Sequence, residues 1–332
     1  MMPRSLTKQK AWKTIKCISF MLVFTLILST LSPMFLPKSN GMNINVKNRL
    51  ARGFYGEPQN SLDVIAVGNS NIECGFSPME LWKRYGITGY TCGEPCQTIF
   101  DAYNLLSEVM TCQKPKVVIL DVDGIFPLNN RVDSYYKLLN STLNRFFPVI
   151  QYHDFWKTIH PGNSVQSATY LWASPTRGYL YSGMALPFSG RRLPKKSGLA
   201  TDQIDTAILA QLNAFQILCR ENGAQLVLVY IPTAFSWDLE RHYLITEYAA
   251  ANDLPFVDLN TASNDSHINW NKDTRDGGIH LNYSGAKRVT LYLGAYLQRH
   301  FVLPDHRKDM SFDRWNTAYE KYLRMVKPTA HL

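Results

Sequence analysis

Beyond residue 60, the hydrophobic and polar positions alternate between two patterns. Short apolar runs rich in β-branched residues, typical of buried strands, occur at 63–67, 117–120, 225–231 and 256–258. Longer segments with apolar residues at helical spacing occur at 97–112, 202–222 and 237–252. Because strands that alternate with helices form parallel sheets, the pattern predicts an α/β domain, a three-layer sandwich with a central parallel sheet.

A polar turn follows the first of these predicted strands. Residues 68–71 read Gly-Asn-Ser-Asn, and Ser77 and Glu80 further on are typical of a capping box that opens a helix. Open α/β sheets carry their chemistry at the carboxyl ends of the strands, which is where Ser70 falls. A turn that only connects two elements is the alternative interpretation.

A glycine-rich loop near the other end of the chain carries an acid and a histidine. Asp276 lies four residues before His280, and a helix pattern starts at Ser284. A hydroxyl nucleophile needs a base within hydrogen-bond reach and a third group that orients the base. Ser70 and this loop contain the residue types for that arrangement.

In these stretches, over residues 60–300, the chain resembles the SGNH (GDSL-like) hydrolase superfamily. It looks most similar to the membrane-anchored bacterial branch that handles acyl groups on cell-surface glycans. The resemblance implies a flavodoxin-like sheet, Ser70 as the nucleophile and His280 as the general base. SGNH proteins share several short sequence blocks, and Gly93 lies at the position of the second. The resemblance also implies that the backbone N–H groups of Ser70 and Gly93 form the oxyanion hole.

The acid is displaced from the position that is usual in the family. The usual position is three residues before the histidine, and here it is Gly277. We expect Asp276 to reach His280 through a turn that is one residue longer, since glycine accepts backbone angles closed to other residues. Asp273 is the competing candidate, and the remaining alternative is that no carboxylate orients His280.

The third block also differs from the family. It lies at 117–124 and has no Asn, the residue that usually completes the oxyanion hole. An ionised aspartate does not donate a hydrogen bond, so the hole is expected to rest on the two backbone N–H groups alone. We expect Asn71 and Asp123 to face the substrate, and we expect no metal or other cofactor.

The N-terminal part of the chain predicts a membrane anchor. Residues 17–36 are uncharged and apolar, and about 20 such residues cross a bilayer. Residues 1–52 hold nine of the 35 basic residues and no acid, so 26 basic residues balance the 26 acidic ones in the body. Basic residues before the span predict a cytosolic N-terminus and an extracytoplasmic body. A cleaved signal peptide is the alternative, and the neutral body argues against nucleic acid as a partner.

The chain divides into six predicted parts. They are a cytosolic basic segment (1–16), a transmembrane anchor (17–36), a tether (37–60), an α/β domain (61–304) with an insertion at about 126–200, and a C-terminal helical tail (305–332). The insertion is rich in aromatic residues, and it is expected either to cap the site or to form a small core of its own. The basic residues at 191–196 are expected to lie in a solvated loop.

Three cysteines lie close to the predicted site in the sequence: Cys74, Cys92 and Cys96. Outside the cytosol a disulfide among them is compatible with the sequence, and so are free buried thiols.

Together these features predict a serine esterase or acyltransferase outside the cytosol. Its substrate would be an O-acyl group, in particular O-acetyl, on a cell-surface glycan or wall polymer, and Ser70 and His280 would carry the reaction. The alternative belongs to another class: a catalytically silent SGNH-like module that binds glycan or serves a polymer-assembly complex.

Overall fold

The computed structural model describes residues 4–35, 50–126, 131–153, 174–188, 190, 204–261 and 266–326. Its contacts divide the chain into two units, which are described separately. The smaller unit comprises Met1–Lys38 and Leu139–Thr169, and the larger one comprises Ser39–Leu138 and Tyr170–Leu332.

A five-stranded parallel sheet forms the centre of the larger unit, in the order β2-β1-β3-β4-β5. The strands are β1 (Val64–Gly68), β2 (Gly89–Gly93), β3 (Val117–Asp121), β4 (Gln225–Tyr230) and β5 (Phe256–Asp258). The predicted α/β class is confirmed. The sequence pattern missed β2, because its residues are Gly-Tyr-Thr-Cys-Gly and include no run of aliphatic side chains.

Helices cover both faces of this sheet. They are α2 (Ser70–Gly75), α3 (Pro78–Tyr85), α4 (Ile99–Met110), α7 (Thr206–Glu221), α8 (Leu239–Ala251), α9 (Tyr283–His300) and α10 (Asp313–Val326). Short 3-10 helices lie at η2 (Gly53–Gly56), η3 (Val122–Ile125) and η6 (Met310–Phe312). The helices predicted at 97–112, 202–222 and 237–252 are present as α4, α7 and α8, each shorter by a few residues.

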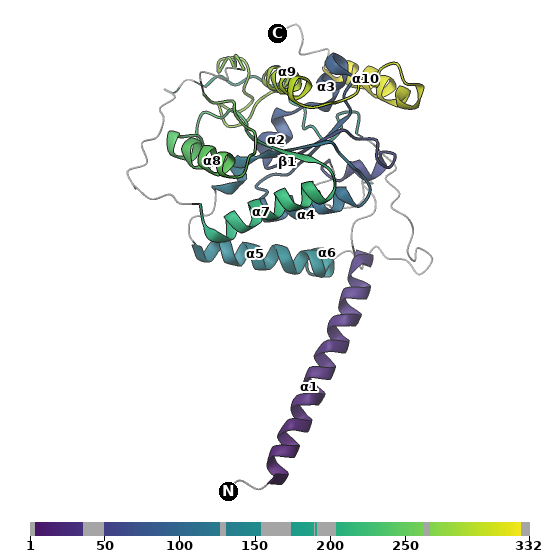
Figure 1. Ribbon diagram of the computed structural model, residues 1–332. Helices are drawn as coiled ribbons and strands as arrows, with labels where there is room; N and C mark the ends of the chain where they lie inside the picture. Colours follow the sequence, from purple (N-terminus) through teal and green to yellow (C-terminus); the bar gives the residue numbers. More distant parts are fainter. Residues whose placement is uncertain are drawn as a thin grey trace. The chain divides into compact units, whose positions relative to one another are not determined.

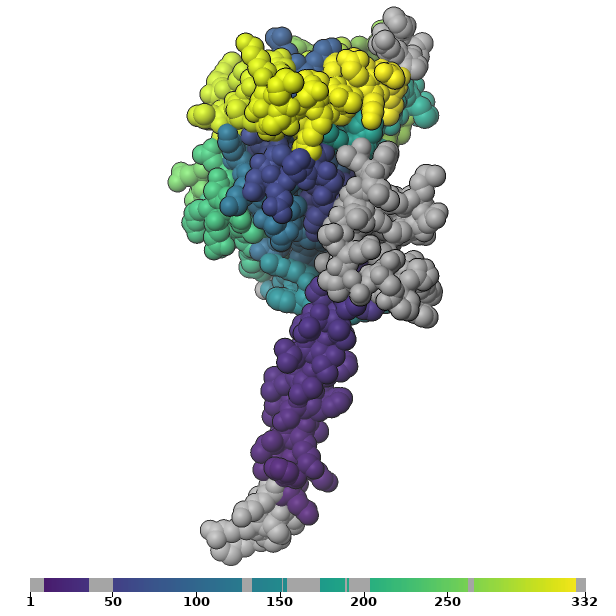
Figure 2. Space-filling view, turned by 90° about the vertical axis from the view of Figure 1, so that its right-hand side faces the viewer, coloured from purple at the N-terminus to yellow at the C-terminus, as the bar shows by residue number. Residues whose placement is uncertain are grey.

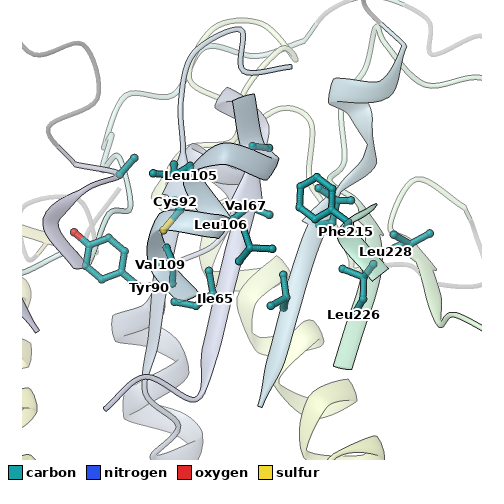
Figure 3. Packing of buried hydrophobic residues seen from close by; sticks show 14 of the residues in the cluster. Ile65, Val67, Tyr90, Cys92, Leu105, Leu106, Val109, Phe215, Leu226 and Leu228 are labelled. Carbon is teal, nitrogen blue, oxygen red and sulfur yellow. The ribbon is translucent and has the colours of Figure 1, made fainter. Parts of the chain in front are cut away.

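Alternate strand residues point to opposite faces, so the sheet separates two cores. Residues such as Ile65, Val67, Leu226 and Leu228 pack with α4 and α7, as Figure 3 shows. Their neighbours in the same strands pack with α3 and α9 on the other face (Figure 1). Both faces of each strand are therefore buried, which explains why these strands are continuous apolar runs in the sequence.

The strand order places a switch point at β1. The chain leaves β1 for β2 on one side of it and then returns to β3 on the other side. In open parallel sheets, ligands bind outside the carboxyl ends of the strands at such a point. The segments that follow β1, β2 and β3 therefore meet at one edge of the sheet.

The C-terminal tail is part of this unit. The ring of Trp315 in α10 lies 5.3 Å from that of Trp82, and the Arg314 guanidinium contacts Glu57 at 2.8 Å. In Figure 2 the yellow C-terminal region accordingly lies against the blue early part of the chain. Residues 50–60, which the sequence analysis included in the tether, also belong to the folded unit, since Phe54 is fully buried.

One local expectation is wrong, and one open alternative is resolved. Ser77 is the N-cap of α3, but its hydroxyl lies 3.1 Å from that of Tyr322 and makes no bond to the helix, so there is no capping box. The six cysteines are free thiols, so no disulfide joins Cys74, Cys92 and Cys96. The basic residues expected in a loop at 191–196 lie outside the described residues.

The smaller unit contains α1 (Arg4–Leu31), η1 (Ser32–Phe35) and α6 (Pro148–Tyr152), while α5 (Arg131–Phe146) starts before it. The Ser32 hydroxyl accepts the Val149 N–H at 2.9 Å. Among the described residues, one stretch, Gln9–Phe35, is helical, long and apolar enough to cross a membrane. An anchor and a signal sequence share these properties.

This helix and its basic flank predict that the larger unit lies outside the cytosol. Protease added to intact cells should degrade the larger unit if the N-terminus is cytosolic, the orientation that basic residues before a span favour. Immunoblotting after protease treatment measures this, with a cytosolic protein as the control. Protection that persists until the membrane is opened would contradict the predicted orientation.

Candidate active site

The proposed nucleophile lies in the turn between β1 and α2. Ser70 is the first residue of α2, and Asn69 is the N-cap, whose side-chain oxygen accepts the Asn71 N–H at 2.8 Å. The Ser70 N–H is one of the first-turn groups that no intrahelical carbonyl accepts. Ser70 is half-buried at the carboxyl edge of the sheet.

The loop before α9 is closed by its own backbone. Thr274 and Leu281 form an antiparallel bridge, and the Arg275 N–H donates to the His280 carbonyl at 3.1 Å. Gly277 and Gly278 have φ values of 77° and 106°, which L side chains rarely adopt. These two glycines accommodate the extra residue between the acid and the histidine.

Asp276, His280 and Ser70 form a continuous chain of hydrogen bonds. The His280 Nδ1 lies 2.6 Å from Asp276 Oδ2, and its Nε2 lies 2.8 Å from Ser70 Oγ. The other oxygen of Asp276 accepts the His280 backbone N–H at 2.7 Å. With Nδ1 protonated, Nε2 is the acceptor for the Ser70 hydroxyl, which is the arrangement a serine nucleophile needs.

Asp273 is not the orienting acid. It is fully buried, and its Oδ2 accepts the Asn269 N–H at 2.7 Å and contacts the Arg288 guanidinium at 3.0 Å. Of the two aspartates that the sequence left open, Asp276 is the one that contacts the His280 ring.

Asp276 is held ionised next to the histidine. Partial burial opposes its charge, but hydrogen bonds from the backbone and ring of His280 outweigh the burial and lower its pKa below the usual value. The Arg275 guanidinium, 3.7 Å away, acts in the same direction. Burial raises the pKa of the nearby Cys74 thiol to about 12, so this cysteine stays a neutral thiol.

Gly93, at the end of β2, packs against the first turn of α2. A Cβ at this position would lie 2.7 Å from the Glu73 nitrogen, so only glycine allows the approach. The next residue, Glu94, donates its N–H to the Gly68 carbonyl at 3.2 Å. Because successive N–H groups alternate in direction along a strand, the Gly93 N–H points away from β1, on the opposite side from that of Glu94.

Asn71 and Asp123, which we expected to face the substrate, are bound to each other in the structure. Asn71 is buried, and its side-chain amide donates to Asp123 Oδ2 at 3.1 Å. The same oxygen accepts the Asn69 amide at 2.7 Å, and the Tyr230 hydroxyl lies 2.9 Å from Oδ1. These polar groups are occupied with one another, which sequence spacing alone does not reveal.

Two further residues near Ser70 and Asp276, Glu73 and Arg275, were not predicted from the sequence. Glu73 lies three residues after Ser70 and therefore on the same side of α2. It is 6% exposed, its Oε2 has no hydrogen-bond partner among the described residues, and burial raises its pKa to about 7 despite the charge of Arg275. The helical i, i+3 spacing from Ser70 is the signal that points to Glu73.

No protein-family model matches this chain, and no curated protein matches it. Among solved structures, it is similar to a provisionally described acylhydrolase from Bacteroides fragilis NCTC 9343, with 16% identity over 77% of this chain and 96% of the other, at a TM-score of 0.39. It is similar to a GDSL-like lipase from Bacteroides thetaiotaomicron VPI-5482, with 13% identity over 75% and 98% of the two chains, at 0.39. An acetyl xylan esterase from the rumen bacterium Butyrivibrio proteoclasticus shows 10% identity over 73% and 65%, at 0.35. Similarity this distant gives no information about activity.

The buried Glu73 predicts a specific pH dependence of stability. Its ordinary pKa is 4.5, so between about pH 4.5 and 7 the unfolded chain loses this proton while the folded chain keeps it. Stability therefore falls as the pH rises through this window, by about 1.4 kcal/mol for each unit of pKa difference. Glu73→Gln should raise the unfolding temperature relative to wild type at pH 8 and leave it unchanged at pH 4.5. Equal differences at both pH values would contradict the burial of an acid at this position.

Proposed function

We propose that this protein is an SGNH-type serine esterase or acyltransferase that acts outside the cytosol. Its substrate would be an O-acyl group, in particular O-acetyl, on a cell-surface glycan or wall polymer. The observation that carries the proposal is the hydrogen-bonded chain from Asp276 through His280 to Ser70 at the carboxyl edge of a parallel sheet. This constellation activates a serine for attack on an acyl carbonyl.

The proposed reaction follows from the positions of these atoms. His280 Nε2 takes the proton as Ser70 Oγ attacks the carbonyl carbon, and Asp276 stabilises the imidazolium that forms. The N–H groups of Ser70 and Gly93 bind the oxyanion. His280 then gives the proton to the oxygen of the departing alcohol as its bond to the acyl carbon breaks. The acyl-serine that remains is resolved by water or a sugar hydroxyl through the same steps.

Apolar side chains beside the His280 loop support an acylated sugar as the substrate. The Gly277 N–H donates to the Leu186 carbonyl at 3.2 Å, and the side chain of Leu186 is about half exposed. The ring of Phe188 lies 5.3 Å from that of Phe235, which is also about half exposed, and 6.3 Å from that of Trp270. Such surfaces fit the methyl of an acetyl group and the apolar face of a sugar ring.

The N-terminal helix supports a place at the cell surface. A serine enzyme tethered on the outer side of the membrane meets glycans and wall polymers, and it does not meet cytosolic esters. Hydrolysis and transfer use the same residues here, and they differ in which acceptor attacks the acyl-serine.

The silent-module alternative retains one supporting observation, the third block without an Asn. The other argument for a silent module was the displaced acid, and the 2.6 Å distance between Asp276 and His280 speaks against it. We therefore favour the enzyme.

Ser70→Ala should lower kcat for aryl acetate hydrolysis by a factor on the order of 10³ or more, because the nucleophile is lost. Acetate release from an acetylated polysaccharide should fall in parallel. Ser284→Ala, the same change at an exposed position in the first turn of α9, is the matched control. Equal activity of wild type and Ser70→Ala would remove Ser70 from the mechanism, and an inactive wild type would favour the silent module.

A further inference from the structure

One carboxylate oxygen holds both residues that flank Ser70. Asp123 Oδ2 accepts the side-chain amides of Asn69 at 2.7 Å and Asn71 at 3.1 Å. Both asparagines are at least nine-tenths buried, and Asp123 lies in η3 directly after β3. We propose that Asp123 is a positioning residue for the reaction at Ser70: it fixes the nucleophile turn through these two amides. This inference rests on the proposed function.

Asn69 transmits this restraint to the backbone of the turn. Its side-chain oxygen accepts the Asn71 N–H at 2.8 Å, while its side-chain nitrogen donates to Asp123. Any rotation of the Asn69 side chain breaks at least one of the two bonds. The Ser70 N–H lies between these anchored neighbours, so its direction depends on Asp123.

In this chain Asp123, in the third block, thus has a different role from the Asn that usually completes the oxyanion hole. An ionised carboxylate accepts hydrogen bonds and donates none, so Asp123 does not stabilise an oxyanion directly. The oxyanion hole rests on the N–H groups of Ser70 and Gly93, and one of these belongs to the turn that Asp123 holds. Since an oxyanion forms only during the reaction, disorder in this turn lowers kcat and leaves ground-state binding of the ester nearly unchanged.

The other oxygen of Asp123 explains which substitution is tolerated. The Tyr230 hydroxyl lies 2.9 Å from Asp123 Oδ1 and 2.9 Å from the Ser236 carbonyl. If Asn replaces Asp123, its oxygen accepts both asparagine amides and its NH₂ donates to the Tyr230 oxygen. The tyrosine proton then goes to Ser236, so every polar group keeps a partner. Alanine at the same position leaves both amides without an acceptor.

The test compares Asp123→Ala, Asp123→Asn and Tyr230→Phe with the wild type on p-nitrophenyl acetate. Asp123→Ala should lower kcat about 10- to 100-fold with KM changed less than about threefold, the size expected for a misplaced reacting group. Asp123→Asn should restore kcat to within about fivefold of wild type, and Tyr230→Phe should stay within about threefold. Rates are expressed per folded molecule, from thermal unfolding followed by circular dichroism.

The possible outcomes separate the two proposals. If the wild type hydrolyses the ester and Asp123→Ala has the same kcat per folded molecule, the positioning role is overturned while the esterase remains. If Asp123→Ala and Asp123→Asn lose kcat equally, the role of the accepted hydrogen bonds is overturned. A wild type without activity overturns the proposed function and this inference together.

Discussion

The parallel ladder that joins β1 to β2 on one side and to β3 on the other sets the geometry of the whole site. It brings three chain segments, which follow Gly68, Gly93 and Asp121, to one edge of the sheet. A Cβ on Gly68 would lie 2.7 Å from that of Asp121, so a side chain at position 68 would collide with Asp121. The Ser70 turn, Gly93 and the carboxylate of Asp123 thus take their positions from hydrogen bonds that also hold the fold.

The base and its acid come from a separate part of the chain. The loop before α9 is closed by a backbone bridge between Thr274 and Leu281, and inside it both oxygens of Asp276 bind His280. The sheet and this loop are joined at the 2.8 Å contact between His280 and Ser70. In an enzyme, a shift of about 1 Å at such a contact is enough to reduce catalysis, so the proposed function requires both segments to hold this geometry.

The sequence was sufficient to predict the sheet class and the three residues of this chain of hydrogen bonds. Runs such as 117–120 are apolar on both faces, which identifies them as buried strands. Ser70, Asp276 and His280 stand in glycine-containing stretches beside predicted strands and helices, which identifies them as residues of turns. The strand β2 was missed because its burial comes from neighbours distant in sequence and not from its own aliphatic content. The contacts of Asp123 were missed because they join residues more than 50 positions apart, which no local pattern reports.

The proposed function requires Ser70 to be a nucleophile that His280 activates. Reaction of the purified protein with a fluorophosphonate, followed by peptide mass mapping, tests this directly, since such reagents form stable adducts with activated serines. We predict a single adduct on the peptide that contains Ser70, formed slowly or not at all in His280→Ala. An unlabelled wild type, or an adduct on another residue, would contradict the account.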